Sequence, residues 1–214
     1  MYKRQVQPNT KLVFVETIAN PRTQVSDLVG IGAVCKAQGL IYVVDNTLTT
    51  PYLFQPKSVG ACLVINSLTK YIGGHGNALG GSVTEMGQFD WTTFANIHEN
   101  YRVGTPSMWG LNQIKKKGLR DFGASLAADS AHRLSTGADT LALRMARACD
   151  NAYALAKFFQ GHDLIDAVYY PGLPDHPQHQ RALDLFGRPG AILSIELQPE
   201  IDCFRFLNQL QTVI

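Results

Sequence analysis

Two side chains in this sequence could together hold an aldehyde cofactor. Asp45 directly follows the apolar run Leu40–Val44, and Lys70 follows the run Leu63–Ile65 after a short polar stretch. Because ligands bind beyond the carboxyl ends of the strands in an open α/β sheet, both side chains lie where a ligand is expected. A carboxylate there can keep a pyridine nitrogen protonated, and a lysine amine can bond to an aldehyde carbon. The pair therefore predicts pyridoxal 5'-phosphate, held on Lys70 as a Schiff base.

Two hydroxyl side chains stand close to Lys70 in the sequence. Ser67 and Thr69 are suited to bind phosphate oxygens at the mouth of the sheet. Taken singly, each of these residues has a simpler interpretation, because a strand-end aspartate is more often a turn or cap residue and most lysines are solvated. The hypothesis depends on their combination and on their order along the chain.

The elements that would position these residues are short apolar strands separated by helical and turn patterns. Near-continuous apolar runs of this kind are typical of a mostly parallel sheet covered on both faces. We expect strands at Lys11–Glu16, Leu40–Val44 and Leu63–Ile65. A helix is expected from a Ser26 cap to Gln38, with Gly39 as its terminating glycine. The glycine-dense segment Gly73–Gly81 is expected to be a loop.

The second half of the chain has the pattern of a different unit. From Thr140 to Gly161, apolar residues recur at helical spacing and predict one long amphipathic helix. Further strands are expected at Val168–Tyr170 and Ala191–Leu197, and further helices at Gln178–Phe186 and Ile201–Val213. We therefore expect residues 1–137 to be the central part of a large cofactor-binding domain and residues 138–214 to begin a smaller α+β domain.

Composition excludes several classes of protein. The 214 residues are 45% hydrophobic and 17% charged, with a formal net charge of +2. Such a small, dispersed charge argues against a nucleic-acid or membrane surface, and the longest apolar runs are too short to span a bilayer. Four cysteines lie far apart without a CxxC pair: Cys35, Cys62, Cys149 and Cys203. We expect a reduced, cytoplasmic protein.

Several segments carry a resemblance to a known family. The most specific is Asn66–Gly76 (NSLTKYIGGHG), with the pattern Ser-x-Thr-Lys-Tyr-x-x-Gly-His. The other matching segments are Val15–Thr17, Asn20–Pro21, Val43–Thr47, Pro51–Tyr52, Leu141–Met145, Tyr170–Leu173 and His176–Pro177. Together they make the chain similar, over nearly its whole length, to the Cys/Met-metabolism PLP-dependent enzymes. That family includes cystathionine γ-synthase, cystathionine lyases, homoserine-ester sulfhydrylases and methionine γ-lyase.

The resemblance implies a fold and a set of site residues. The fold would be fold-type I, aspartate aminotransferase-like: a mostly parallel, seven-stranded-type sheet covered by helices, plus part of a smaller α+β carboxy-terminal domain. Lys70 would carry the cofactor and act as the catalytic base, and Asp45 would pair with the ring nitrogen. Ser67 and Thr69 would contact the phosphate, and Asn20 would lie near the phenolic oxygen of the ring. No metal is expected.

The resemblance also implies a trans-sulfuration enzyme of sulfur amino-acid metabolism. The regions around Ile18–Asn20 and Ser67–Lys70 favour γ-replacement on an O-acylhomoserine, as in cystathionine γ-synthase or homoserine sulfhydrylase. The partners would be a small amino-acid substrate and a thiol, and the full-length protein would be a homodimer or homotetramer. The alternatives are a PLP-dependent C–S lyase, acting on cystathionine or methionine, and a catalytically inert part of such an enzyme.

Departures from the family pattern point to a truncated chain and an unusual subgroup. Cys62 stands where an acidic residue usually opens the strand before the lysine, and Leu68 stands where a small residue is usual. The family's upstream phosphate loop, stacking tyrosine and Tyr/Arg pair have no match before Lys11. The downstream arginine that grips the substrate carboxylate would follow Ile214. We therefore expect the chain to be the central part of a longer enzyme.

Other residues and motifs allow competing interpretations. His75 could act in catalysis, although a hydrogen bond that stabilises the glycine loop is the simpler role. His176 and His179 could form a metal pair, but no further ligands accompany them, so a turn and a helix start fit better. A Rossmann nucleotide-binding module is a poor match, because Gly30-x-Gly32 falls inside the expected helix.

Overall fold

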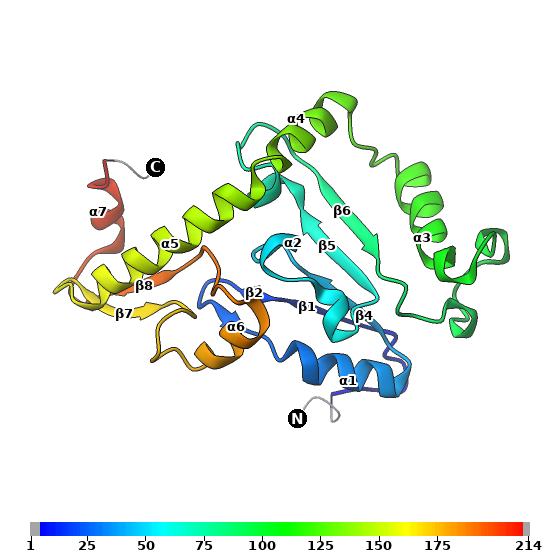
Figure 1. The fold of residues 1–214 in the computed structure, drawn as a ribbon, viewed down its shortest axis with the longest axis horizontal. Helices are drawn as coiled ribbons and strands as arrows, with labels where there is room; N and C mark the ends of the chain where they lie inside the picture. The colour runs from blue at the N-terminus through cyan, green and yellow to red at the C-terminus, as the bar shows by residue number, and fades with distance from the viewer. Residues whose placement is uncertain (1–4, 212–214) are drawn as a thin grey trace. The chain divides into compact units, whose positions relative to one another are not determined.

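The computed structural model describes residues 5–211, which form two compact units (Figure 1). The first unit consists of the residues up to Thr17 together with Ser26–Ala142, and the second of Ile18–Val25 together with the residues from Leu143 onward. Along the chain the units divide after Ala142. The domain boundary expected after residue 137 stays a prediction, and the sequence did not anticipate that the short segment Ile18–Val25 groups with the second unit.

A four-stranded sheet with the order β1-β4-β5-β6 organises the first unit. Three strands run parallel: β1 (Leu12–Glu16), β4 (Ile41–Asp45) and β5 (Leu63–Ser67). The fourth, β6 (Gly81–Glu85), is antiparallel to β5 along its whole length. This mixed, mostly parallel sheet confirms the expected α/β fold class. Within the described residues the sheet has four strands. Strand β6 was not predicted from the sequence, because it has no apolar run and several of its side chains are exposed.

Helix α1 (Leu28–Gln38) packs on the sheet next to the central strand β4. Its cap is Asp27, whose carboxylate accepts a hydrogen bond from Gly30 N at 3.0 Å, so the expected Ser26 cap is wrong by one residue. Gly39 ends the helix at φ +61°, as expected. The Tyr42 hydroxyl donates to Leu28 O at 3.1 Å and joins the strand to the helix. The core of this unit is formed by Ile31, Cys35, Leu40–Val44, Ala61–Val64, Trp91 and Ile97.

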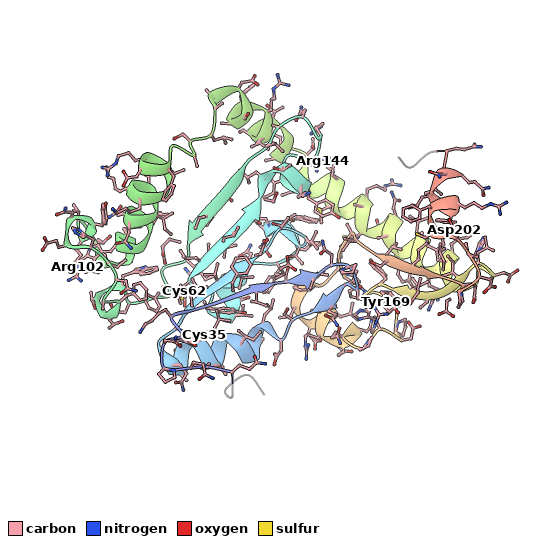
Figure 2. The ribbon with its side chains drawn as sticks, turned by 180° about the vertical axis from the view of Figure 1, so that it is seen from behind. Cys35, Cys62, Arg102, Arg144, Tyr169 and Asp202 are labelled. Carbon is pink, nitrogen blue, oxygen red and sulfur yellow. The ribbon has the colours of Figure 1, made fainter. Side chains whose placement is uncertain are left out.

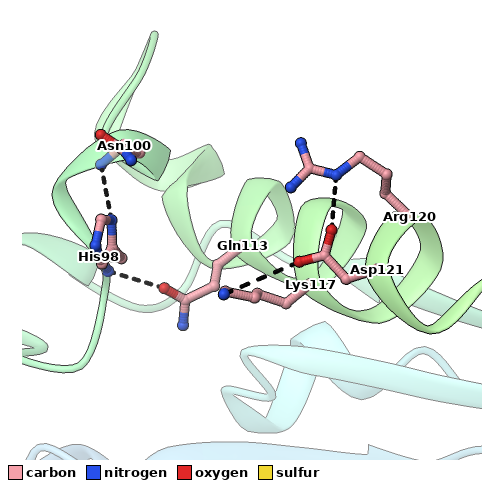
Figure 3. Close-up of polar contacts among 6 residues, drawn as sticks. All are labelled: His98, Asn100, Gln113, Lys117, Arg120 and Asp121. Atoms are coloured by element: carbon pink, nitrogen blue, oxygen red, sulfur yellow. Dashed lines mark hydrogen bonds and ion pairs between the residues drawn. The ribbon is translucent and has the colours of Figure 1, made fainter.

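The later part of the first unit is made of short turns and helices. These are α2 (Thr50–Leu53), η2 (Pro56–Val59), η3 (Leu68–Ile72), η4 (Trp91–Thr93), η5 (Glu99–Tyr101), η6 (Pro106–Met108), α3 (Trp109–Gln113), η7 (Ile114–Asp121) and α4 (Ala128–Ala138). Figure 3 shows two polar contacts in this region: His98 N, just before η5, donates to Gln113 Oε1 of α3 at 2.9 Å, and within η7 Asp121 accepts from Arg120 at 2.7 Å. These charges are exposed, so they contribute little to stability.

The second unit contains the long helix α5 (Leu141–Gln160), which confirms the amphipathic helix expected there. The other elements are β2 (Ile18–Ala19), β3 (Gln24–Val25), β7 (Ile165–Tyr169), α6 (His179–Phe186), β8 (Ser194–Leu197) and α7 (Cys203–Asn208). Strand β7 pairs antiparallel with β8, and β2 with β3. A buried Tyr170 donates its hydroxyl to Gly190 O at 3.0 Å within the small core. Helix α7 ends before the expected Val213, which lies outside the described residues.

Side chains of the second unit hold the β2–β3 segment in place. The Arg22 guanidinium lies 3.4 Å from Glu196 and 4.7 Å from the centre of the ring of Tyr169, which is labelled in Figure 2. The Tyr169 hydroxyl donates to the same Glu196 carboxylate at 2.5 Å. Arg181 donates to Val25 O at 2.9 Å. These contacts explain why Ile18–Val25 groups with the later part of the chain. None of the helices that the described residues form combines the length and apolar composition that crossing a bilayer requires.

Two buried thiols in the first unit predict a loss of stability at alkaline pH. Burial, together with the neighbouring Cys62, raises the pKa of Cys35 from 9.0 to about 11, and burial also raises the pKa of Cys62; both residues are labelled in Figure 2. The folded state therefore binds these protons more tightly than the unfolded state. We expect the free energy of unfolding to fall by about 1.4 kcal/mol per pH unit for Cys35 as the pH rises from 9 to 11.

Urea denaturation at a series of pH values measures this dependence, and Cys35→Ala is the control. The variant should be less stable at pH 7, because it loses buried sulfur, but its stability should fall less steeply above pH 9. An identical slope in the two proteins would contradict the assignment of the effect to Cys35.

Candidate active site

Asp45 and Ser67 lie on the same face of the sheet at its carboxyl edge. Asp45 is the last residue of β4 and pairs with Ile65 of β5. Since alternate residues of a strand share a face, the side chains of Asp45, Ile65 and Ser67 point to one side. Lys70 is the third residue of the turn η3, which follows β5 directly. The structure thus brings Asp45, Ser67, Thr69 and Lys70 to the ends of two neighbouring parallel strands, as the sequence predicts.

Thr47 fixes the Asp45 carboxylate and links the two strand ends. Its backbone N–H donates to Asp45 Oδ1 at 2.9 Å, and its hydroxyl accepts from Ser67 N at 2.8 Å. One carboxylate oxygen is therefore oriented by a backbone donor. Thr47 was not among the site residues predicted from the sequence, although an aspartate that accepts from the N–H two residues later is a common turn signal.

A buried polar network supports this turn from behind. The Thr49 hydroxyl lies 2.6 Å from Asn46 Oδ1 and 2.9 Å from the Thr17 hydroxyl, and all three residues are at most 1% exposed. Asn46 Nδ2 donates to Phe54 O at 3.0 Å. Thr50, buried beside them, has φ +58°, a conformation that a β-branched residue adopts only when its surroundings impose it. The network holds the chain immediately after Asp45 in one conformation.

We expect Thr49→Val to lower the free energy of unfolding by about 1–3 kcal/mol, because valine keeps the shape but leaves buried Asn46 Oδ1 without its donor. Urea denaturation measures the change. Thr84→Val on β6 is the matched control, since Thr84 is exposed, and it should change stability by less than about 0.5 kcal/mol. Equal effects of the two substitutions would show that the network does not stabilise the turn.

The turn that carries Lys70 is irregular. Lys70 has φ −83° and ψ −124°, which interrupts the helical geometry of η3. Backbone bonds close the turn on both sides: Gly73 N donates to Leu68 O and Gly74 N to Lys70 O, each at 2.8 Å. The Lys70 side chain is exposed, and among the described residues its amine has no hydrogen bond or ion pair. The amine is thus available for a ligand.

The two hydroxyls expected at the phosphate have different surroundings. The Thr69 hydroxyl donates to Gly80 O at 3.2 Å and accepts from Gly80 N at 3.0 Å, so it is bound to the backbone. The Ser67 hydroxyl has no hydrogen-bond partner among the described residues. Of the two, Ser67 is therefore the better placed donor for an anion. Gly80, which was not among the residues predicted for the site, holds the Thr69 hydroxyl in place.

The remaining candidates lie elsewhere. His75 Nδ1 lies 2.7 Å from Gly73 O, a contact within the glycine loop. Asn20 belongs to the second unit, where it is exposed and precedes Pro21 in a cis peptide bond, so its role at the cofactor stays a prediction. His176 is buried, which lowers its pKa, and its Nδ1 accepts from Gln178 N at 3.2 Å. Within residues 5–211, no three side chains of the metal-binding types come together.

The donor set fits pyridoxal 5'-phosphate. A bound form of this cofactor requires an amine for the aldehyde carbon, a carboxylate for the ring nitrogen and donors for the phosphate. Lys70, Asp45 and Ser67 provide these three kinds of group at one edge of the sheet, and each is free of competing side-chain ion pairs among the described residues.

Comparison with known proteins leads to the same chemistry. The model of a family described as Cys/Met metabolism PLP-dependent enzyme matches residues 1–214. An L-methionine gamma-lyase from Porphyromonas gingivalis is 36% identical over 90% of the chain and 44% of its own length. An O-acetyl-L-homoserine sulfhydrylase from Leptospira meyeri is 31% identical over 98% of the chain and 52% of its own length.

A solved structure is also similar. The crystal structure of cystathionine gamma-lyase from Lactobacillus plantarum, complexed with L-serine, superposes with a TM-score of 0.81 at 29% identity; the match covers 98% of this chain and 50% of that one. This likeness confirms the expected fold-type I architecture. The chain spans about half the length of the curated relatives it matches.

Proposed function

Because the chain belongs to the Cys/Met metabolism PLP-dependent enzyme family, we propose that it is part of an enzyme that replaces the γ-substituent of an O-acylhomoserine with a thiol. The observation that carries the proposal is the arrangement of Asp45 and Lys70 at the carboxyl ends of neighbouring parallel strands. The named activity of the Leptospira meyeri relative, a sulfhydrylase of O-acetyl-L-homoserine, supports the choice of substrate class.

Each site residue has a distinct role in this proposal. When bound, pyridoxal phosphate supplies an electron sink that makes protons on the substrate carbons acidic. Lys70 holds the cofactor and, once its amine is free, removes and returns those protons as a general base and acid. Asp45, oriented by Thr47 N, keeps a proton on the ring nitrogen. Ser67 donates to the phosphate, with Asn20 proposed at the phenolic oxygen.

A second candidate is elimination, in which the enzyme cleaves a C–S bond without adding a thiol. The methionine gamma-lyase and cystathionine gamma-lyase among the similar proteins favour it. The residues at the two strand ends serve both reactions, so only the products separate them. γ-Replacement by sulfide on O-acetylhomoserine yields homocysteine and acetate, whereas γ-elimination from methionine yields a keto acid, methanethiol and ammonia.

Two measurements on the purified chain test the proposal. A new visible absorption band after addition of pyridoxal phosphate is expected, and the absence of a band would contradict cofactor binding at Lys70. Product analysis with O-acetylhomoserine and sulfide, and separately with methionine, then identifies the reaction. A band without either product would support the view that this portion of the enzyme is inert on its own.

We further propose that the full-length protein is a cytoplasmic homodimer or homotetramer. The four cysteines are all unpaired in the structure, which suits a reducing compartment. Light scattering on the full-length protein would measure its assembly state directly.

Substitutions at Ser67 and Thr69 should separate direct from indirect effects on the cofactor. We expect Ser67→Ala to weaken cofactor binding by roughly 10- to 100-fold, because it removes a donor to a charged group worth about 1.5–3 kcal/mol, while the fold stays intact. Thr69→Ser, which keeps the hydroxyl bound to Gly80, should bind the cofactor nearly normally. Fluorescence or absorption titration measures both. Weaker binding by Thr69→Ser than by Ser67→Ala would reverse the assignment.

A further inference from the structure

Helix α4 contacts the turn that carries Lys70 through two glycines with no room for a side chain. A β-carbon added at Gly137 of α4 would lie 2.0 Å from Gly73 O and 2.8 Å from the Gly73 carbonyl carbon. Because both atoms belong to the backbone, they cannot rotate out of the way. The helix and the turn therefore touch through their main chains, and Gly137 is fully surrounded there.

One leucine of the same helix occupies the space beside two glycines of the loop. A β-carbon at Gly73 would lie 2.7 Å from Leu134 Cδ2, and one at Gly80 would lie 2.6 Å from Leu134 Cδ1. Leu134 is 4% exposed. Its two methyl groups thus pack against both ends of the glycine loop that follows Lys70.

These two ends determine where Lys70 and Thr69 stand. At one end, Gly73 N bonds to Leu68 O and closes the turn around Lys70. At the other end, Gly80 bonds to the Thr69 hydroxyl and to Thr69 N. The Lys70 amine has no side-chain partner among the described residues, so the backbone of the turn sets its place. A shift of α4 would consequently move the turn.

We propose that Leu134 and Gly137 are positioning residues for Lys70, and that α4 sets the place of the cofactor-binding turn. The inference rests on the proposed role of Lys70 as the cofactor lysine. Helix α4 contributes none of the site residues named above, so its proposed effect on the reaction is indirect.

Gly137→Ala tests the contact against a matched substitution. Alanine in place of a helical glycine ordinarily favours the helix. If Gly137 made no close contact, the substitution would therefore slightly raise the stability of the protein. We expect instead a displaced turn: faster amide exchange in residues 68–81, a shifted visible band of bound pyridoxal phosphate, and a fall in kcat on the order of 100-fold, since a misplacement of about 1 Å can cost that much. Gly118→Ala in η7, where the nearest atom is 4.0 Å away, should leave all three unchanged.

Leu134→Ala is the second variant, in case Gly137→Ala does not fold, with Leu119→Ala as its control at an exposed site. It should loosen the loop and change the cofactor band while KM changes little, whereas a purely structural role would lower only the unfolding midpoint. Unaltered exchange in residues 68–81 in both α4 variants would overturn the inference. If the unaltered chain shows no cofactor band, the proposed function fails instead, and amide exchange still decides whether α4 positions the turn.

Discussion

Replacing Lys70 with alanine is expected to abolish the visible absorption band of bound pyridoxal phosphate and to reduce turnover by more than about 10³-fold. The variant loses the covalent attachment and also the group that moves protons, and the second effect alone is worth about 10²–10⁴-fold. The fold should survive, because the Lys70 side chain is exposed and has no hydrogen bond or ion pair with another described residue. Absorption spectra and product formation measure the two losses, and circular dichroism checks the fold.

Lys115→Ala is the matched control, since it removes another exposed lysine, from η7 of the same unit, and should leave the band intact. Addition of a small primary amine to the Lys70→Ala protein should restore a fraction of the turnover, because the amine can take over proton transfer. A visible band of normal intensity in Lys70→Ala would place the cofactor on another lysine and would refute the site proposed here.

The sequence was informative where a strand end carries the chemistry. The apolar runs before Asp45 and Lys70 form β4 and β5, and a buried parallel pair necessarily brings their carboxyl ends together. The antiparallel strand β6 could not be recognised in the same way, because Gly81, Ser82 and Thr84 have no apolar periodicity; its place is set by pairing with β5. Local patterns therefore identified the strands that contain apolar runs and missed the one that depends on a neighbour.

The contacts that hold the candidate site residues in place could be predicted from the sequence only in part. The bonds from Thr47 to Asp45 and Ser67 follow partly from turn chemistry, but that the Thr47 hydroxyl reaches the next strand depends on the register of β4 and β5. The approach of Gly137 to Gly73 joins segments more than sixty residues apart, and no spacing rule links two such glycines. The candidate ligand-binding residues could be predicted from the sequence, whereas the residues that hold them in place required the fold.

Asp45→Asn should separate the charge of the carboxylate from its shape. The amide oxygen can still accept the hydrogen bond from Thr47 N, so the turn and the overall stability should change little. The variant can no longer keep the ring nitrogen protonated by its negative charge. We expect the cofactor to bind, with a shifted visible band, and kcat to fall on the order of 10²–10³-fold, the usual cost of removing one oriented electrostatic contact to the reacting system.

The conservative variant Asp45→Glu distinguishes this effect from simple misplacement. Glutamate retains the charge but moves it outward by one methylene, away from the Thr47 donor, so it should recover part of the lost kcat and restore the position of the visible band. If Asp45→Asn turned over at the normal rate, the carboxylate would serve only as a turn residue for Thr47. The proposal that two strand ends form one cofactor site would then lose the half that belongs to β4, because Ser67 is the last residue of β5 and Lys70 lies in the turn that follows it.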